Sequence, residues 1–251
     1  MKSNLPRLAA LVLAATVGLA AHAADLTVSA AASLTNAFKD LAPIFESENP
    51  GTKVQFNFAA SGVLLQQIAK GAPVDVFASA DQKTMDDAQK QGLVQQAARR
   101  NFVSNALVVI VPAANVKPVA ALKDLTQAPF ERVAIGLPDS VPVGRYTKSV
   151  LEAEGLWTAI EPRMIGAQNV RQALDYVARG EVDAGFVYST DAALMPDKVK
   201  VALTVATTQP ILYPVAPIAA STNHAMAVRF VDFLGSPQAQ AVLTKYGFGK
   251  P

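Results

Sequence analysis

Two stretches of the chain share one design: Ala30-Ala31-Ala32-Ser33-Leu34-Thr35 and Ala59-Ala60-Ser61-Gly62-Val63-Leu64. Each runs from a strand-like segment through small residues to a serine, and then directly into a helical pattern. At such a junction the serine hydroxyl and the unpaired backbone N–H groups of the first helical turn can bind one anion. Two more helix starts of this kind follow, at Val143-Gly144 and Asn169-Val170. The set predicts a site that captures a small anion without using charged groups.

Outward from these junctions, the chain alternates between strand and helix patterns. Strands are expected at residues 26–29, 53–58, 74–78, 106–111, 133–137, 184–188 and 199–205. Helical spacing of apolar residues predicts helices at residues 34–46, 63–69, 145–153, 170–178, 226–234 and 237–246. Asp81 is expected to cap one further helix. Because helices separate the strands, the pattern indicates an α/β fold with largely parallel sheets.

The junctions supply most of the candidate site. In an open parallel sheet, ligands bind where strands end and helices begin. Ser33 and Ser61 would each offer a hydroxyl and a backbone N–H, whereas Val143 and Val170 would offer only the backbone N–H. Tyr188 ends a buried-looking strand, so its hydroxyl could donate a hydrogen bond to the same anion.

Each of these features also has an ordinary structural interpretation. A serine before a helix is commonly a helix cap, and Tyr188 could instead hold its hydroxyl at the surface. Gly62 and Gly144 would let the backbone approach a ligand closely. The prediction of a site therefore depends on the whole set of junctions rather than on one of them.

The first 23 residues have the features of an export signal. Lys2 and Arg7 precede an apolar run at 8–21 that is too short to span a bilayer, which needs about 20 residues. Ala21-His22-Ala23 fits the small-x-small cleavage pattern, so cleavage is expected after Ala23, with Ala24 as the near alternative.

Charge and composition exclude several classes of function. The chain has 22 Lys and Arg against 20 Asp and Glu, and without Lys2 and Arg7 the two signs balance at 20 each. A nucleic-acid-binding protein would usually show a basic excess. The chain has no cysteine, and His224 is the one histidine beyond the export signal. Thiolate metal sites, thiol catalysis and chemistry that needs two imidazoles are therefore excluded.

Four stretches resemble the periplasmic molybdate-binding proteins of ABC transporters, within the type II periplasmic substrate-binding proteins. They are Ala30-Ala31-Ala32-Ser33-Leu34-Thr35-Asn36-Ala37-Phe38, Gly71-Ala72-Pro73-Val74-Asp75-Val76-Phe77-Ala78-Ser79-Ala80-Asp81-Gln82-Lys83, Val141-Pro142-Val143-Gly144-Arg145-Tyr146 and Tyr246-Gly247-Phe248. The resemblance covers essentially the whole mature chain. It implies two α/β lobes, each a mainly parallel sheet flanked by helices, that close on a ligand in the cleft between them.

The resemblance also implies where the lobes divide. Lobe I would comprise residues 24–104 and 216–251, and lobe II residues 105–215. The proline-rich stretch 209–217 would then be a crossover between the lobes.

A set of binding residues follows from the resemblance: Ser33, Ser61, Val143, Val170 and Tyr188. Two donors from each serine and one from each other residue would surround molybdate or tungstate, seven in all. They would contact the oxygens of the anion, with no direct metal ligand and no cofactor. Val143 is larger than the small residue associated with its position, which affects only the volume of the pocket. The implied partner is the membrane permease of an ABC transporter, and the chain is expected to be a periplasmic monomer that catalyses no reaction and binds no nucleic acid.

The chemistry of molybdate agrees with such a donor set. Near neutral pH the ion is a fully deprotonated dianion, which offers only acceptors. A carboxylate in the site would instead select a protonated anion such as hydrogen phosphate. Arg145 and Arg171 follow site residues, and we expect them to point away from the anion and to be solvated or paired with acids.

Three other interpretations remain open at this point. An exported hydrolase with a Ser-His-Asp triad would need His224, but no Gly-x-Ser-x-Gly motif precedes a helix. A carrier for another ligand is the second: sulfate sites use the same donor chemistry with a smaller cavity, whereas ferric sites favour paired tyrosines, and the five tyrosines here are scattered along the sequence. The third is the ligand-sensing domain of a regulator, which the export signal and the lack of a DNA-binding segment disfavour.

Overall fold

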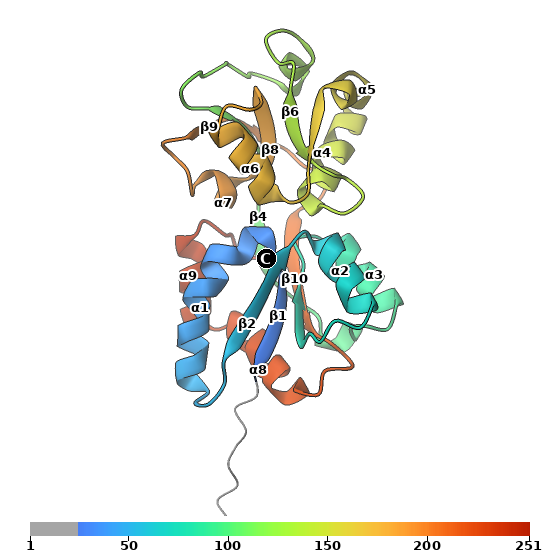
Figure 1. Ribbon diagram of the computed structural model, residues 1–251, viewed down its shortest axis with the longest axis vertical. Helices are drawn as coiled ribbons and strands as arrows, with labels where there is room; N and C mark the ends of the chain where they lie inside the picture. Colours follow the sequence, from blue (N-terminus) through green and yellow to red (C-terminus); the bar gives the residue numbers. More distant parts are fainter. Residues whose placement is uncertain (1–24) are drawn as a thin grey trace, which may run out of the picture.

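The computed structural model describes residues 25–251 and shows two α/β lobes stacked along the long axis of the molecule (Figure 1). The predicted export signal and its cleavage point lie outside the described residues. Each lobe is built on one five-stranded sheet, in the orders β2-β1-β3-β10-β4 and β7-β6-β8-β5-β9. The α/β class and the two-lobed arrangement expected from the sequence are confirmed.

Lobe I contains the first and last parts of the described chain. Helices α1 and α9 lie on one side of its sheet, and α2 and α3 lie on the other (Figure 1). Its strands and helices are β1 (Leu26–Ala31), α1 (Thr35–Glu48), β2 (Val54–Ala59), α2 (Ser61–Ala69), β3 (Val76–Ala78), α3 (Gln82–Lys90), β4 (Arg100–Asn105), β10 (Ile211–Pro217), α8 (His224–Leu234) and α9 (Pro237–Lys245), with a 3-10 turn, η1, at Ala32–Leu34 and another, η2, at Gln96–Ala98.

Lobe II is formed by the intervening segment. Its strands and helices are β5 (Leu107–Pro112), β6 (Val133–Gly136), α4 (Pro142–Ala153), α5 (Trp157–Ile160), β7 (Met164–Ala167), α6 (Val170–Ala178), β8 (Ala184–Tyr188), α7 (Ser189–Ala192) and β9 (Val199–Val205), with 3-10 turns η3 at Leu122–Thr126 and η4 at Glu161–Arg163. Within residues 25–251, no helix is both long enough and apolar enough to cross a membrane.

The sheets are mixed rather than wholly parallel: in each, four of the five strands run in one direction, as a mainly parallel sheet requires, and one strand runs against them. In lobe I, β1 pairs in parallel with β2 and β3, whereas β10 pairs antiparallel with β3 and β4. Lobe II repeats this pattern, with β6 parallel to β7 and β8, and β5 antiparallel to β8 and β9. The reason is the path of the chain, which crosses into lobe II through β5 and returns to lobe I through β10. They start at the junction between the lobes, where their neighbours end.

Strand β10 also corrects the expected division of the chain. The proline-rich stretch 209–217 is not simply a crossover, because Ile211–Pro217 lies inside the lobe I sheet. Lobe I therefore resumes at Ile211 rather than at 216, while its first part ends with β4 at Asn105, close to the expected 104. The sheet accommodates Pro214 because the register with β4 shifts between Tyr213 and Pro214, and such an irregularity tolerates a residue without an N–H group.

Candidate anion-binding site

All five predicted site residues line one small cavity between the lobes. The cavity has a volume of about 10 Å³, far below the roughly 300–1,000 Å³ typical for drug-sized ligands. Among the described residues that line it, none carries a charge: Ala31, Ala32, Ser33, Ala59, Ala60, Ser61, Ala80, Val141, Pro142, Val143, Asn169, Val170 and Tyr188. The cavity therefore suits a guest of a few atoms that is held by neutral groups.

Helix starts from both lobes converge on this cavity. Ser33 lies in η1 and Ser61 begins α2 in lobe I, while Val143 lies in the first turn of α4 and Val170 begins α6 in lobe II. Backbone N–H groups in a first turn have no carbonyl partner within their own helix. The partial positive charge at these helix ends adds to the attraction for an anion.

Ser61 and Tyr188 meet at Ala80, which lies just after β3. The Ala80 N–H donates to Ser61 Oγ at 3.0 Å, so the hydroxyl hydrogen of Ser61 is available to another acceptor. Tyr188 Oη lies 3.5 Å from the Ala80 carbonyl oxygen, which is too long for a strong bond. Burial raises the pKa of Tyr188 well above its usual value, so this phenol stays neutral and can donate.

Ser33 contacts a residue that the sequence did not single out. Its Oγ lies 3.0 Å from the hydroxyl of Tyr213 on β10, and both side chains are buried. Tyr213 also accepts a hydrogen bond from Asn105 Nδ2 at 3.1 Å. The Tyr213 ring packs edge-on against Tyr188 and Phe248, with centroid separations of 5.7 and 5.6 Å.

The two glycines at the junctions have a different role from the one expected. Gly62 donates its N–H to the carbonyl of Ser140 in the opposite lobe at 3.0 Å, and a Cβ on Gly62 would lie 2.6 Å from that oxygen. A Cβ on Gly144 would lie 1.9 Å from the carbonyl oxygen of Gly136. The close approach is therefore between backbone and backbone. The absence of a side chain at Gly62 allows α2 of lobe I to contact Ser140 of lobe II. The absence of one at Gly144 allows α4 to pack against the end of β6.

Arg145 and Arg171 pair with acids, as expected, and neither lines the cavity. Arg145 reaches from lobe II to lobe I, where its Nε donates to Asp81 Oδ2 at 2.7 Å and its Nη2 to Thr84 Oγ1 at 2.7 Å. Asp81 also caps α3 by accepting from the Thr84 N–H. This ion pair therefore joins the lobes beside the cavity.

Arg171 makes a second connection between the lobes. Its Nε donates to Asp191 Oδ1 of lobe II at 2.6 Å, and its Nη1 and Nη2 donate to Asn36 Oδ1 and the Ser33 carbonyl of lobe I at 2.8 and 3.1 Å. Asp191 is fully buried, and its Oδ2 has no hydrogen-bond partner among the described residues. Burial raises the pKa of Asp191 to about 6, although Arg171 partly opposes this effect.

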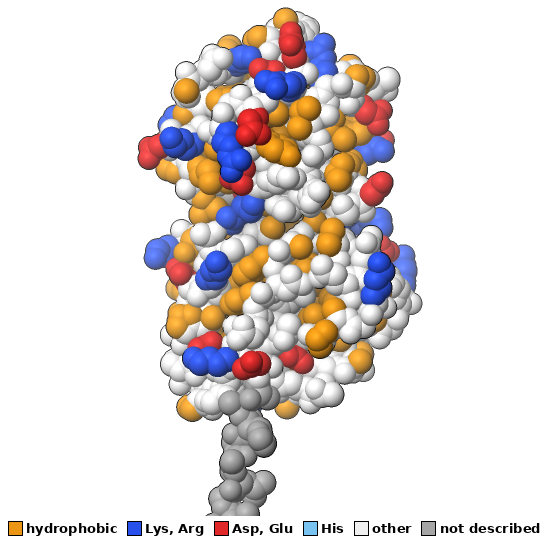
Figure 2. Space-filling view, in the orientation of Figure 1, with side chains coloured by type: hydrophobic (Ala, Val, Ile, Leu, Met, Phe, Trp, Pro, Cys, Tyr) orange, Lys and Arg blue, Asp and Glu red, His pale blue; other side chains and the backbone are white. Residues whose placement is uncertain are grey.

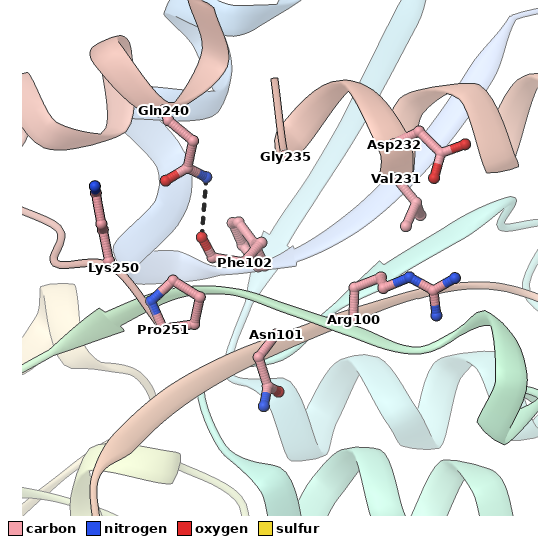
Figure 3. A pocket seen from close by; sticks show the side chains of 9 residues that line it. All are labelled: Arg100, Asn101, Phe102, Val231, Asp232, Gly235, Gln240, Lys250 and Pro251. Carbon is pink, nitrogen blue, oxygen red and sulfur yellow. Dashed lines mark hydrogen bonds between the residues drawn. The ribbon is translucent and has the colours of Figure 1, made fainter. Parts of the chain in front are cut away.

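A larger hollow lies elsewhere, on lobe I near the end of the chain (Figure 3). It has a volume of about 520 Å³, and Figure 3 shows Arg100, Asp232 and Lys250 along its walls. No sequence motif pointed to this groove, and it lacks convergent helix starts. His224, the residue that a hydrolase would need, is exposed at the start of α8 and does not line the cavity between the lobes.

The surface charges of the protein are mixed. On the face shown in Figure 2, basic and acidic side chains are interspersed over both lobes. Within residues 25–251, no group of three or more His, Cys, Asp or Glu side chains is placed to hold a metal ion.

Two tyrosines that are far apart in the sequence lie together in the fold, so their scattering along the chain does not exclude a ferric site. Tyr188 and Tyr213 lie side by side, and burial raises the pKa of both phenols. A ferric ion would need phenolates together with imidazole or carboxylate ligands. Within the described residues, no group of three or more His, Cys, Asp or Glu side chains is placed to join the two phenols around a metal ion, and this geometry disfavours a ferric site.

Comparisons with known proteins agree with this geometry. Residues 26–249 match the family of bacterial extracellular solute-binding proteins. The molybdate-binding protein ModA of Escherichia coli K12 is 39% identical over 251 residues, covering 98% of this chain and 96% of that protein. ModA of Haemophilus influenzae is 34% identical, covering 98% of each.

Solved structures give the same picture. The periplasmic molybdate-binding protein of Azotobacter vinelandii superposes with a TM-score of 0.75 at 26% identity, covering 90% of this chain and 99% of that one. The sulfate-binding protein SubI of Mycobacterium tuberculosis superposes with a TM-score of 0.76 at 20% identity, covering 89% and 86%. The second likeness shows the fold alone.

Proposed function

The chain belongs to the family of bacterial extracellular solute-binding proteins, and we propose that it captures molybdate and delivers it to the permease of an ABC importer. The observation that supports this most strongly is the small cavity between the lobes, lined by helix starts and hydroxyls and by no charged side chain among the described residues. The relatives that match nearly the full length of the chain carry the name molybdate-binding protein.

The donor set explains how a neutral site can hold a dianion. Ser33 and Ser61 would each donate from a hydroxyl and an N–H, Val143 and Val170 from an N–H, and Tyr188 from its hydroxyl. Hydrogen bonds to a charged group contribute about 1.5–3 kcal/mol each, so seven give roughly 10–20 kcal/mol before costs. Dehydration of the anion and closure of the lobes offset part of this. A dissociation constant in the micromolar to nanomolar range follows, which corresponds to about −8 to −12 kcal/mol.

Tungstate is expected to bind as molybdate does, because the two ions match in charge and shape and nearly in size. Sulfate is the alternative ligand, since it offers the same acceptors on a smaller ion. The S–O bonds of sulfate are shorter than the metal–oxygen bonds of molybdate and tungstate. Some donors would therefore lie too far from the sulfate oxygens to form hydrogen bonds, and this favours the two larger anions. The proposed partners are therefore the oxyanion and the membrane permease, and we place a monomeric, non-catalytic protein in the periplasm with no bound cofactor.

Isothermal titration of the mature chain with molybdate, tungstate, sulfate and hydrogen phosphate tests this function. Molybdate and tungstate should bind with micromolar or lower dissociation constants, and sulfate should bind about tenfold more weakly or worse. Sulfate binding as tightly as molybdate would transfer the assignment to sulfate. An absence of binding by all four anions would reject the proposal.

A further inference from the structure

We propose that Tyr213 is a positioning residue that holds the Ser33 hydroxyl as a hydrogen-bond donor to the anion, at the end of a chain of hydrogen bonds that begins at Asn105. This inference rests on the proposed function, because it concerns the same site. It adds two residues, one on β4 and one on β10, that do not line the cavity. It also explains why the site should prefer an anion that carries no proton.

Asn105, at the end of β4, determines which group donates and which accepts along this series of hydrogen bonds. Asn105 Oδ1 accepts from the backbone N–H of Ala106 at 2.9 Å and lies 3.0 Å from Ser189 Oγ. A backbone N–H can only donate, so the amide of Asn105 cannot turn over without losing this bond. Its Nδ2 therefore faces Thr190 Oγ1 at 2.9 Å and Tyr213 Oη at 3.1 Å.

The same order of donor and acceptor continues from Tyr213 to Ser33. Because Asn105 Nδ2 can only donate, the Tyr213 oxygen accepts, and its own hydrogen needs an acceptor. Ser33 Oγ, at 3.0 Å, is the one further hydrogen-bond partner of the Tyr213 hydroxyl within residues 25–251. If Ser33 donated instead, the buried Tyr213 hydrogen would be left unpaired, which is costly. Ser33 Oγ therefore accepts from Tyr213, and its own hydrogen is left for the cavity.

The second serine is held in the same way by the backbone. The Ala80 N–H donates to Ser61 Oγ at 3.0 Å, so the Ser61 hydrogen is also left for the cavity. Both hydroxyls are thus set as donors before the anion arrives. A protonated anion such as hydrogen phosphate needs an acceptor for its hydrogen, and this arrangement discriminates against it.

A double-mutant cycle measured by titration calorimetry tests the role of Tyr213. In Tyr213→Phe the ring packing is kept, but Ser33 can turn away from the anion. With Ser33 present, Tyr213→Phe should therefore lower molybdate affinity about tenfold. In the Ser33→Ala background the same substitution should change the affinity hardly at all, because the effects of two coupled residues do not add. The ratio of molybdate to hydrogen phosphate affinity should also fall in the Tyr213→Phe chain.

Asn105→Asp provides a second variant should Tyr213→Phe fail to fold, as judged by its melting temperature. A carboxylate can only accept, so Tyr213 would donate to it and Ser33 would donate to Tyr213. The loss of affinity should then be larger in the chain with Ser33 than in the Ser33→Ala chain, and the effect of the added charge is common to both backgrounds.

Tyr246→Phe is the matched control, since its hydroxyl bonds to Asp40 on the surface at 2.7 Å, and it should bind molybdate as the wild type does. Equal losses in the Ser33 and Ala backgrounds, or an unchanged affinity of Tyr213→Phe, would overturn the positioning role and leave the proposed function standing. A wild-type chain that binds no molybdate would overturn both.

Discussion

Among single residues, the two serines accept hydrogen bonds within the protein in addition to the anion binding that we propose for them. Ser61 accepts from the Ala80 N–H, and in the proposed chain of hydrogen bonds Ser33 accepts from Tyr213. Ser33→Ala and Ser61→Ala should each weaken molybdate binding by about 1–3 kcal/mol. Both substitutions should also lower the free energy of unfolding, because Ser61→Ala leaves the buried Ala80 N–H unpaired and Ser33→Ala leaves the buried Tyr213 hydroxyl without its acceptor. Titration calorimetry gives the first effect, and urea unfolding without ligand gives the second.

Ser47→Ala is a suitable control for these variants, since Ser47 Oγ bonds to the Ile44 carbonyl at an exposed position on α1. It should leave molybdate affinity unchanged. Wild-type affinity in both cavity-serine variants would contradict the placement of the site.

Asp191 should make stability depend on pH. Burial raises its pKa in the folded protein to about 6, against about 3.9 in an unfolded chain. Between about pH 4 and pH 6 the carboxyl therefore ionises in the unfolded chain but stays protonated in the folded protein. The contribution of Asp191 to the free energy of unfolding falls over this range as pH rises, by up to about 1.4 kcal/mol per pH unit. In urea unfolding at pH 4.5 and 7, the stability of the wild type relative to Asp191→Asn should be lower at pH 7. A difference that does not change with pH would contradict a buried, titrating carboxyl.

The sequence predicts residues whose role is local, and misses those whose role depends on the fold. Ser33, Ser61, Val143 and Val170 could be found because a helix start is visible in a few consecutive residues. Tyr213 could not, because its partners lie far away in the chain at Ser33 and Asn105. Its alternation with Ile211 and Val215 was a signal for a strand, but the prolines beside it indicated a crossover instead.

At the scale of elements, the start of α2 sets how closely the lobes approach. The Gly62 N–H donates to Ser140 of lobe II, and a Cβ would lie 2.6 Å from that carbonyl oxygen. Gly62→Ala should therefore hinder closure and weaken molybdate binding about tenfold or more, while lobe I itself should fold as before. Titration calorimetry and thermal unfolding without ligand separate the two effects.

Ala69→Ser adds an atom to the exposed end of the same helix and should change neither quantity. Wild-type affinity of Gly62→Ala would show that the lobes bind the anion without the contact between Gly62 and Ser140.

Strand direction was the least predictable property of the elements. Pattern and spacing identify β1, β3 and β8 and the helices that follow them. The antiparallel pairing of β5 and β10 arises because each enters a lobe from the junction, which is a property of the chain path. Strands β4 and β7 were missed because Arg100 and Asn101 begin the first and Gly166 interrupts the apolar pattern of the second.

At the scale of the whole molecule, two arginines join the lobes beside a neutral cavity. Arg145 of lobe II donates to Asp81 and Thr84 of lobe I across the cleft, so separation of the lobes is expected to break both bonds. Arg145→Gln should weaken molybdate binding by about 1–2 kcal/mol, mainly by faster release. Stopped-flow dissociation measures this, and thermal unfolding checks the fold of the variant, because Asp81 Oδ2 loses its arginine partner while Oδ1 still caps α3.

Arg179→Gln is the control for this variant, since its contact with Glu181 at 3.8 Å is exposed and lies within lobe II. It should release molybdate at the wild-type rate. A wild-type release rate in Arg145→Gln would show that the ion pair with Asp81 does not contribute to closure.

A crystal structure of the protein with molybdate, with the metal located by its anomalous scattering, tests the central claim most directly. One metal peak is expected in the cavity between the lobes, with the oxygens of the anion in hydrogen-bond contact with Ser33, Ser61, Val143, Val170 and Tyr188. No lysine or arginine should contact the anion. A peak held by Arg145 or Arg171, or one in the groove beside the end of the chain, would contradict it.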